Sequence, residues 1–140
     1  MPIVTAMKGL VTGAAIATLL GGCGTTHQAA AVSDSSPPGP CTAAPPGLVN
    51  LINSSFSGEA EHINGGQVVD GPDDRHYLSA DIYDGDDVVA DDAVWLFREA
   101  QLYTLSPDAL SRSSLPDGRA FGSPDDEYGV ASRRCVDHLR

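Results

Sequence analysis

The chain has 140 residues, a length that suits one domain rather than several. Hydrophobic residues make up 41% and charged residues 19% of the sequence, which argues against a wholly disordered chain. The formal net charge is −11, and this excess of carboxylates argues against a nucleic-acid partner because phosphate contacts need a basic surface.

The first segment has the pattern of a secretory signal peptide. Lys8 is followed by twelve uncharged, mostly apolar residues, 9–20. A helix of that length spans about 18 Å, too short for a hydrocarbon core of roughly 30 Å. We therefore expect residues 1–22 to be a signal peptide that is removed, the alternative being an N-terminal helix buried in the fold.

The next residues, Leu20-Gly21-Gly22-Cys23, resemble the lipobox of bacterial lipoproteins. The resemblance implies that the Cys23 sulfur receives a diacylglycerol, that a dedicated peptidase cuts just before Cys23, and that the new amine is acylated, for example with palmitate. Two or three acyl chains anchor a protein stably, whereas one binds only marginally. The sequence thus predicts a lipoprotein of the cell membrane that faces the extracytoplasmic side.

A tether precedes the folded part of the chain. Residues 24–40 contain one charge, few large apolar side chains and a proline-rich end, a composition that cannot offset the entropy of ordering the chain. We expect residues 23–40 to form a lipidated, disordered tether and residues 41–140 to form a single domain.

The domain is expected to begin with a helix over residues 46–57. Pro46 suits the first helical position, where the missing N–H loses no bond, and Gly58 suits the end. Apolar side chains recur along one face of this segment, at Leu48, Val49, Ile52 and Phe56.

A run of alternating residues then predicts a half-buried strand over residues 77–84. Its apolar side chains are expected to face the helices, and its polar ones to face outward. Asp84-Gly85 after it favours a hairpin. The inward set is Leu78, Ala80 and Ile82, and the outward set is Ser79, Asp81 and Tyr83.

The remaining elements complete an α+β fold. We expect a small antiparallel sheet of three or four strands, with an N-terminal and a C-terminal helix packed on one face. A helix over residues 91–105 is the alternative to the two later strands. The expected elements are a weak strand within 59–71 around a turn at Asn64-Gly65, strands over 88–98 and 102–105, a short helix over 107–113 and a last helix over 124–139.

Two cysteines remain once Cys23 is lipidated. Cys41 and Cys135 lie at opposite ends of the domain, and an exported chain enters an oxidising compartment. They are expected to form one disulfide that closes the domain. Two buried free thiols and a metal pair are the alternatives, although no His stands at zinc-module spacing from either Cys.

No catalytic, cofactor or metal motif is found. Six aspartates cluster within residues 81–92, but no start in this run fits the EF-hand spacing, so a solvated acidic hairpin is favoured over an irregular cation site. The sequence lacks a G-x-S-x-G elbow, and its histidines are isolated, with His76 expected in a solvent-facing turn. No catalytic residue and no cofactor are predicted.

The domain contains five short motifs, namely Ala80–Gly85, Leu102–Ser106, Leu115–Arg119, Asp126–Gly129 and Cys135-Val136. They resemble motifs of small uncharacterised lipoproteins of high-GC Gram-positive bacteria. The group has no assigned reaction, so the resemblance implies no catalytic residue. We favour a non-enzymatic binding or accessory module of the cell envelope, with an envelope protein or a glycan as partner, and the alternative is a cell-envelope hydrolase with an unrecognised site.

Overall fold

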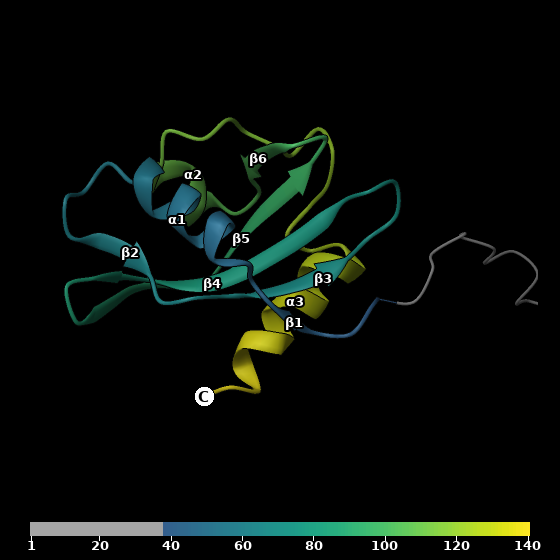
Figure 1. The fold of residues 1–140 in the computed structure, drawn as a ribbon, viewed down its shortest axis with the longest axis horizontal. Helices are drawn as coiled ribbons and strands as arrows, with labels where there is room; N and C mark the ends of the chain where they lie inside the picture. The colour runs from purple at the N-terminus through teal and green to yellow at the C-terminus, as the bar shows by residue number, and fades with distance from the viewer. Residues whose placement is uncertain (1–37) are drawn as a thin grey trace, which may run out of the picture. The chain divides into compact units, whose positions relative to one another are not determined.

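A computed structural model describes residues 38–140, which belong to one compact unit. The expected signal peptide, the lipidation site Cys23 and most of the expected tether lie outside the described residues. Within them the fold is α+β, as predicted, with an antiparallel sheet of six strands and three helices (Figure 1).

The sheet has more strands than the three or four that we expected. The order across it is β1-β3-β4-β5-β6, and β2 pairs with β4 as well. The strands are β1 (Thr42–Ala43), β2 (Glu61–Ile63), β3 (Gln67–Asp70), β4 (His76–Asp84), β5 (Asp87–Arg98) and β6 (Gln101–Thr104).

The predicted hairpins are confirmed. β4 and β5 are joined at Gly85, which has φ 62°, and Asp84 pairs with Asp87 across the turn. Glu99 and Ala100 join β5 to β6 with φ 50° and 61°, the left-handed pair of a tight hairpin turn. Residues 91–105 are therefore strand, turn and strand, and the helical alternative is wrong.

The expected turn at Asn64-Gly65 does not reverse the chain. β2 and β3 both run antiparallel along the same edge of β4, with Ile63 opposite Ile82 and Gln67 opposite Ser79. Residues 64–66 thus form a bulge between two halves of one interrupted strand. Gly65 has φ 99°, and a Cβ on Gly66 would lie 3.0 Å from the backbone oxygen of Ser79, so both positions favour glycine.

The outer edge of β2 is closed by a side chain. The backbone N–H of Ile63 donates to Oδ1 of Asn53 at 2.7 Å, and Nδ2 of Asn53 donates to the Ile63 carbonyl at 3.2 Å. The amide of Asn53 therefore occupies the place of a neighbouring strand.

The helices are α1 (Pro46–Ser55), α2 (Pro107–Arg112) and α3 (Glu127–Asp137), each close to its predicted range. Ser106 caps α2, as its Oγ accepts from the Ala109 N–H. α3 begins later than expected because Asp126 is its N-cap, and the Asp126 carboxylate accepts from the N–H groups of Tyr128 and Gly129.

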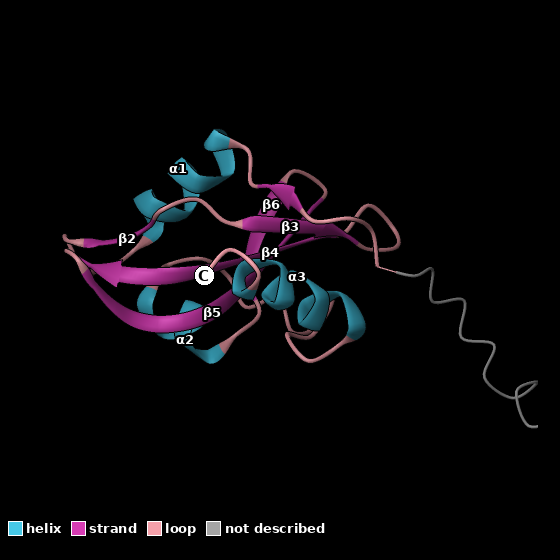
Figure 2. Ribbon diagram, turned by 90° about the horizontal axis from the view of Figure 1, so that it is seen from below, coloured by secondary structure: helices cyan, strands magenta, loops and turns pink. Residues whose placement is uncertain are grey.

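We expected both main helices on one face of the sheet, and this placement is wrong. α1 and α2 cover one face, and α3 covers the other (Figures 1 and 2). The α1 side buries Ile52, Leu78, Ile82 and Trp95 with their neighbours. The α3 side buries Val69, Tyr77, Val94, Leu96, Leu105, Tyr128 and Cys135.

Because α3 covers the second face of the sheet, β4 is buried on both faces rather than on one. Leu78, Ala80 and Ile82 do face a helix layer, as predicted. Ser79 does not face solvent: it is 0% exposed. Tyr77, on the same side of β4, stacks on Tyr128 of α3 with ring centroids 5.6 Å apart and donates from its hydroxyl to Asp126 at 2.8 Å. Burial and the Asp126 carboxylate both raise the pKa of Tyr77 well above its ordinary value.

The predicted disulfide joins Cys41 to Cys135, with their Cα atoms 5.7 Å apart. Cys41 directly precedes β1, and Cys135 is buried in the core under α3. The bond therefore ties the start of the domain to its last helix across 94 residues.

Removing this bond should destabilise the domain. Replacing both Cys41 and Cys135 by Ala is expected to lower the free energy of unfolding by about 4 kcal/mol, since a long closed loop restricts the unfolded chain strongly. Denaturant unfolding of the double variant and the wild type measures the difference. Adding reductant to the wild type should reproduce the loss, and unchanged stability in both experiments would contradict the role of the bond.

Burial of Ser79 gives a second prediction. Ser79→Asp should lower the free energy of unfolding by roughly 3 kcal/mol or more, because a carboxylate would be placed beneath α3 without a partner. Ser79→Ala should leave stability within about 1 kcal/mol of the wild type, as the Ser79 hydroxyl has no hydrogen-bond partner to lose. Thermal melts measure both, and Ser111→Asp, on the exposed side of α2, is the matched control. Equal melting of the Ser79 and Ser111 aspartates would show that this face is open.

Candidate functional site

Asp81 lies between two irregularities of the sheet. On one side of β4 is the bulge at residues 64–66, and on the other the register with β5 shifts between Ala80 and Ile82. Asp92 stands in that second irregularity with φ 52°, and its N–H donates to Oδ1 of Asp81 at 3.0 Å. Bulges commonly accompany functional sites, because they redirect side chains that a regular strand would hold in the sheet.

Arg140, beyond the end of α3, neutralises Asp81. Its Nε donates to Oδ2 of Asp81 at 3.2 Å, and its Nη2 contacts Oδ1 of the same carboxylate. The Asp81 side chain is only 12% exposed, so this ion pair is partly shielded from water. The hydrogen bond to Asp81 is the main cause that raises the pKa of Arg140.

Three more aspartates surround the same guanidinium. Nη2 of Arg140 lies 3.0 Å from Asp92 and 3.7 Å from Asp91, and Nη1 lies 3.0 Å from Asp137. Burial raises the pKa of Asp92, and the nearby carboxylates of Asp137, Asp81 and Asp91 add to that effect while Arg140 opposes it. The guanidinium of Arg140 thus forms ion pairs with four carboxylates.

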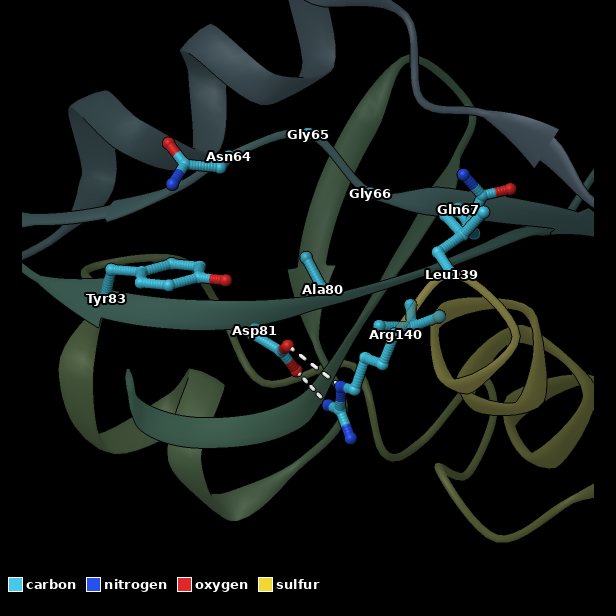
Figure 3. A pocket seen from close by; sticks show the side chains of 10 residues that line it. Asn64, Gly65, Gly66, Gln67, Ala80, Asp81, Tyr83, Leu139 and Arg140 are labelled. Carbon is cyan, nitrogen blue, oxygen red and sulfur yellow. Dashed lines mark hydrogen bonds and ion pairs between the residues drawn. The ribbon is translucent and has the colours of Figure 1, made fainter. Parts of the chain in front are cut away.

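A pocket of about 180 Å³ opens beside this cluster. The bulge and the start of β3 form one wall, β4 forms the floor, and the last residues after α3 form the other wall (Figure 3). Its lining residues are Asn64, Gly65, Gly66, Gln67, Ala80, Asp81, Tyr83, Val136, Leu139 and Arg140.

The acidic run at 81–92 is divided between two places. Asp81, Asp91 and Asp92 gather around Arg140, whereas Asp84, Asp86 and Asp87 are exposed at the hairpin. In residues 38–140 no group of three His, Cys, Asp or Glu side chains could hold a metal ion. The guanidinium occupies the centre that a cation would need.

A second hollow, of about 250 Å³, lies beside β1 and the start of α1. His76 on its rim is the first residue of β4 rather than part of a turn, and its Nδ1 lies 2.6 Å from Oδ1 of Asp70. Among the described residues that line this hollow, Thr42 alone carries a hydroxyl, and that hydroxyl donates to the Val68 carbonyl. The pair therefore has an oriented imidazole but no hydroxyl directed at it.

The disulfide pair can be predicted from the sequence, whereas the pocket could not. The alternation of its strand predicts Asp81 on the solvated face, whereas it lines the pocket beside Arg140. One feature of the sequence could have marked the site, namely a single carboxylate within the otherwise uncharged run from Tyr77 to Tyr83.

No helix within residues 38–140 is long and apolar enough to cross a membrane.

Comparison of the chain with protein-family models, curated proteins and solved structures found no match.

The pKa of Asp92 gives a test of this cluster. When folding raises the pKa of a carboxyl, that carboxyl lowers the free energy of unfolding as the pH rises from its ordinary pKa to the raised pKa. At lower pH the carboxyl is protonated in both states and has no such effect. Asp92→Asn should therefore raise the melting temperature more at about pH 7 than at about pH 3. Asn also tolerates the positive φ, but that gain does not depend on pH. Thermal melts at both pH values measure the effect.

The control for this experiment is Asp86→Asn, in the exposed hairpin. This variant should melt like the wild type at both pH values. A pH-independent gain in Asp92→Asn would assign the whole effect to the backbone and none to the partly buried charge.

Proposed function

We propose that this protein is a lipoprotein of the cell membrane whose folded domain, on the extracytoplasmic side, acts as a non-enzymatic binding module for a component of the cell envelope. The observation that carries the proposal is the disulfide between Cys41 and Cys135, which belongs to an oxidising compartment. The chain has three cysteines, so this bond leaves Cys23, in the lipobox-like sequence, as the one available for acylation.

The organisation of the chain supports the anchor. Residues 24–40 separate Cys23 from the domain, and a flexible chain of seventeen residues spans roughly 20–25 Å. Such a tether would hold the domain just clear of the lipid headgroups. Without the leader and its Lys8 the net charge would be −12, which would also keep the protein off an anionic membrane surface, so acyl chains rather than charge must supply attachment.

Binding is favoured over catalysis by how the polar groups are used. Asp81 and Arg140 satisfy each other, and Thr42, the one hydroxyl residue that lines the hollow beside His76, donates to a backbone carbonyl. The pocket beside Asp81 nevertheless presents amide and phenol groups to an incoming molecule. This combination suits recognition of a ligand without chemical change.

Lipidation is tested by replacing Cys23. In cells grown with radioactive palmitate, the wild type should carry label and fractionate with the membrane, whereas Cys23→Ala should stay unlabelled as a precursor with its leader. Cys41→Ala is the matched control: it should lose the disulfide and keep the label. Equal labelling of the wild type and Cys23→Ala would overturn the proposed anchor.

A further inference from the structure

We infer that the pocket beside Asp81 binds a single neutral sugar unit of a glycan. The inference deepens the binding function proposed above and rests on it for the source of the glycan. It depends on the hydrogen-bonding groups, the charge balance and the shape of the pocket, each of which is described in turn.

Three lining residues offer unused hydrogen-bonding groups. The side-chain amides of Asn64 and Gln67 and the hydroxyl of Tyr83 make no hydrogen bond within the described part of the chain. In Figure 3, Asn64 and Gln67 lie on either side of the glycine bulge, and the hydroxyl end of Tyr83 points along the floor toward Ala80. Each of these groups can donate and accept, as a sugar hydroxyl does.

The residues that line the pocket carry one charge of each sign. Asp81 and Arg140 are the only charged residues in it, and they are paired with each other. Both oxygens of Asp81 already accept hydrogen bonds, from Arg140 and from the N–H of Asp92. An anionic ligand would meet the aspartates around Arg140, and a cationic ligand would find the one carboxylate of the lining, that of Asp81, already bonded. A neutral polar ligand meets neither obstacle.

Apolar surface alternates with these polar groups. Val136 and Leu139 form one side of the pocket. Leu139 is 71% exposed, so its side chain is not part of the core. On the floor, Tyr83 is steadied by His62, whose ring is stacked at 5.7 Å from it. A sugar ring presents C–H faces and hydroxyl edges, and it can use both kinds of surface.

The size of the pocket limits the ligand to one ring. Its volume is about 180 Å³, well below the roughly 300–1,000 Å³ of pockets for larger ligands. A longer glycan could enter with one unit and leave its neighbours in solvent. Of the ligand classes that carry both hydroxyl edges and apolar faces, a neutral pyranose fits these limits best.

Saturation-transfer NMR on the full chain tests the inference, in a detergent that is not itself a glycoside. The probes are N-acetylglucosamine, its β-1,4-linked trimer, glucosamine as a cation and glucuronate as an anion. We expect the two neutral sugars to receive saturation at millimolar concentration and the charged ones to bind at least several-fold more weakly. No transfer to either neutral sugar, or preference for a charged one, would overturn the inference.

Variants locate the binding. Asn64→Ala and Gln67→Ala should each weaken binding about threefold to tenfold, the effect of one neutral hydrogen bond. Tyr83→Phe should do the same while keeping the ring. Asn50→Ala and Gln101→Ala remove exposed amides elsewhere and should bind like the wild type. Equal affinity in all five variants would place the sugar outside this pocket.

The sugar-binding test and the lipid-labelling test can fail independently of each other. Lipid labelling at Cys23 reports the proposed location whether or not a sugar binds. Sugar binding by the domain likewise stands whether or not Cys23 is acylated. Melting temperatures of the variants, compared with the wild type, separate a loss of binding from a loss of folding.

Discussion

The architecture depends on the burial of β4 on both of its faces. From Tyr77 to Ala80 every side chain of this strand is buried, alternately under α1 and under α3. A strand in that position must carry apolar or neutral side chains, because an unpaired charge there would be costly. Asp81, the next residue, violates this requirement, and the surrounding irregularities accommodate it. The bulges on both sides of β4 and the guanidinium of Arg140 are three responses to one carboxylate.

This dependence connects the fold to the proposed function. The same bulge that relieves the sheet near Asp81 places Asn64 and Gln67 on one wall of the pocket. Arg140 is held by Asp81, so the end of the chain after α3 is fixed as the opposite wall. The pocket is thus a product of the sheet's local accommodation, and the polar groups at its rim need not stabilise the domain.

Local sequence patterns predicted the secondary-structure elements well. They did not predict contacts between residues that are far apart in the sequence. Alternation, turn residues and prolines placed the hairpins and all three helices, because each depends on neighbouring residues. The position of α3 could not be found that way: its apolar stripe shows that it packs, but not on which face of the sheet. For this reason the prediction for Ser79 was wrong: a small polar residue suits a solvated face, but Ser79 is buried under α3.

The pocket was missed for a related reason. Asn64-Gly65 is an ordinary turn sequence, and nothing local distinguishes a reversal from a bulge within a continuing strand. The pairing of Arg140 with Asp81 spans 59 residues and depends on the path of α3. The cysteines were the exception, because a count of three with one in a lipobox-like sequence leaves a single pairing.

The disulfide also constrains the order in which the domain can be completed. Its two halves are 94 residues apart, and the core under α3 contains Cys135 itself. A chain that is completed from its N-terminal end would hold Cys41 as a free thiol until α3 has followed. Throughout that interval the α3 side of the sheet, including Val69, Val94 and Leu96, would face solvent. The α3 side of the sheet can therefore be completed only once the last helix is available, whereas the core under α1 does not depend on α3.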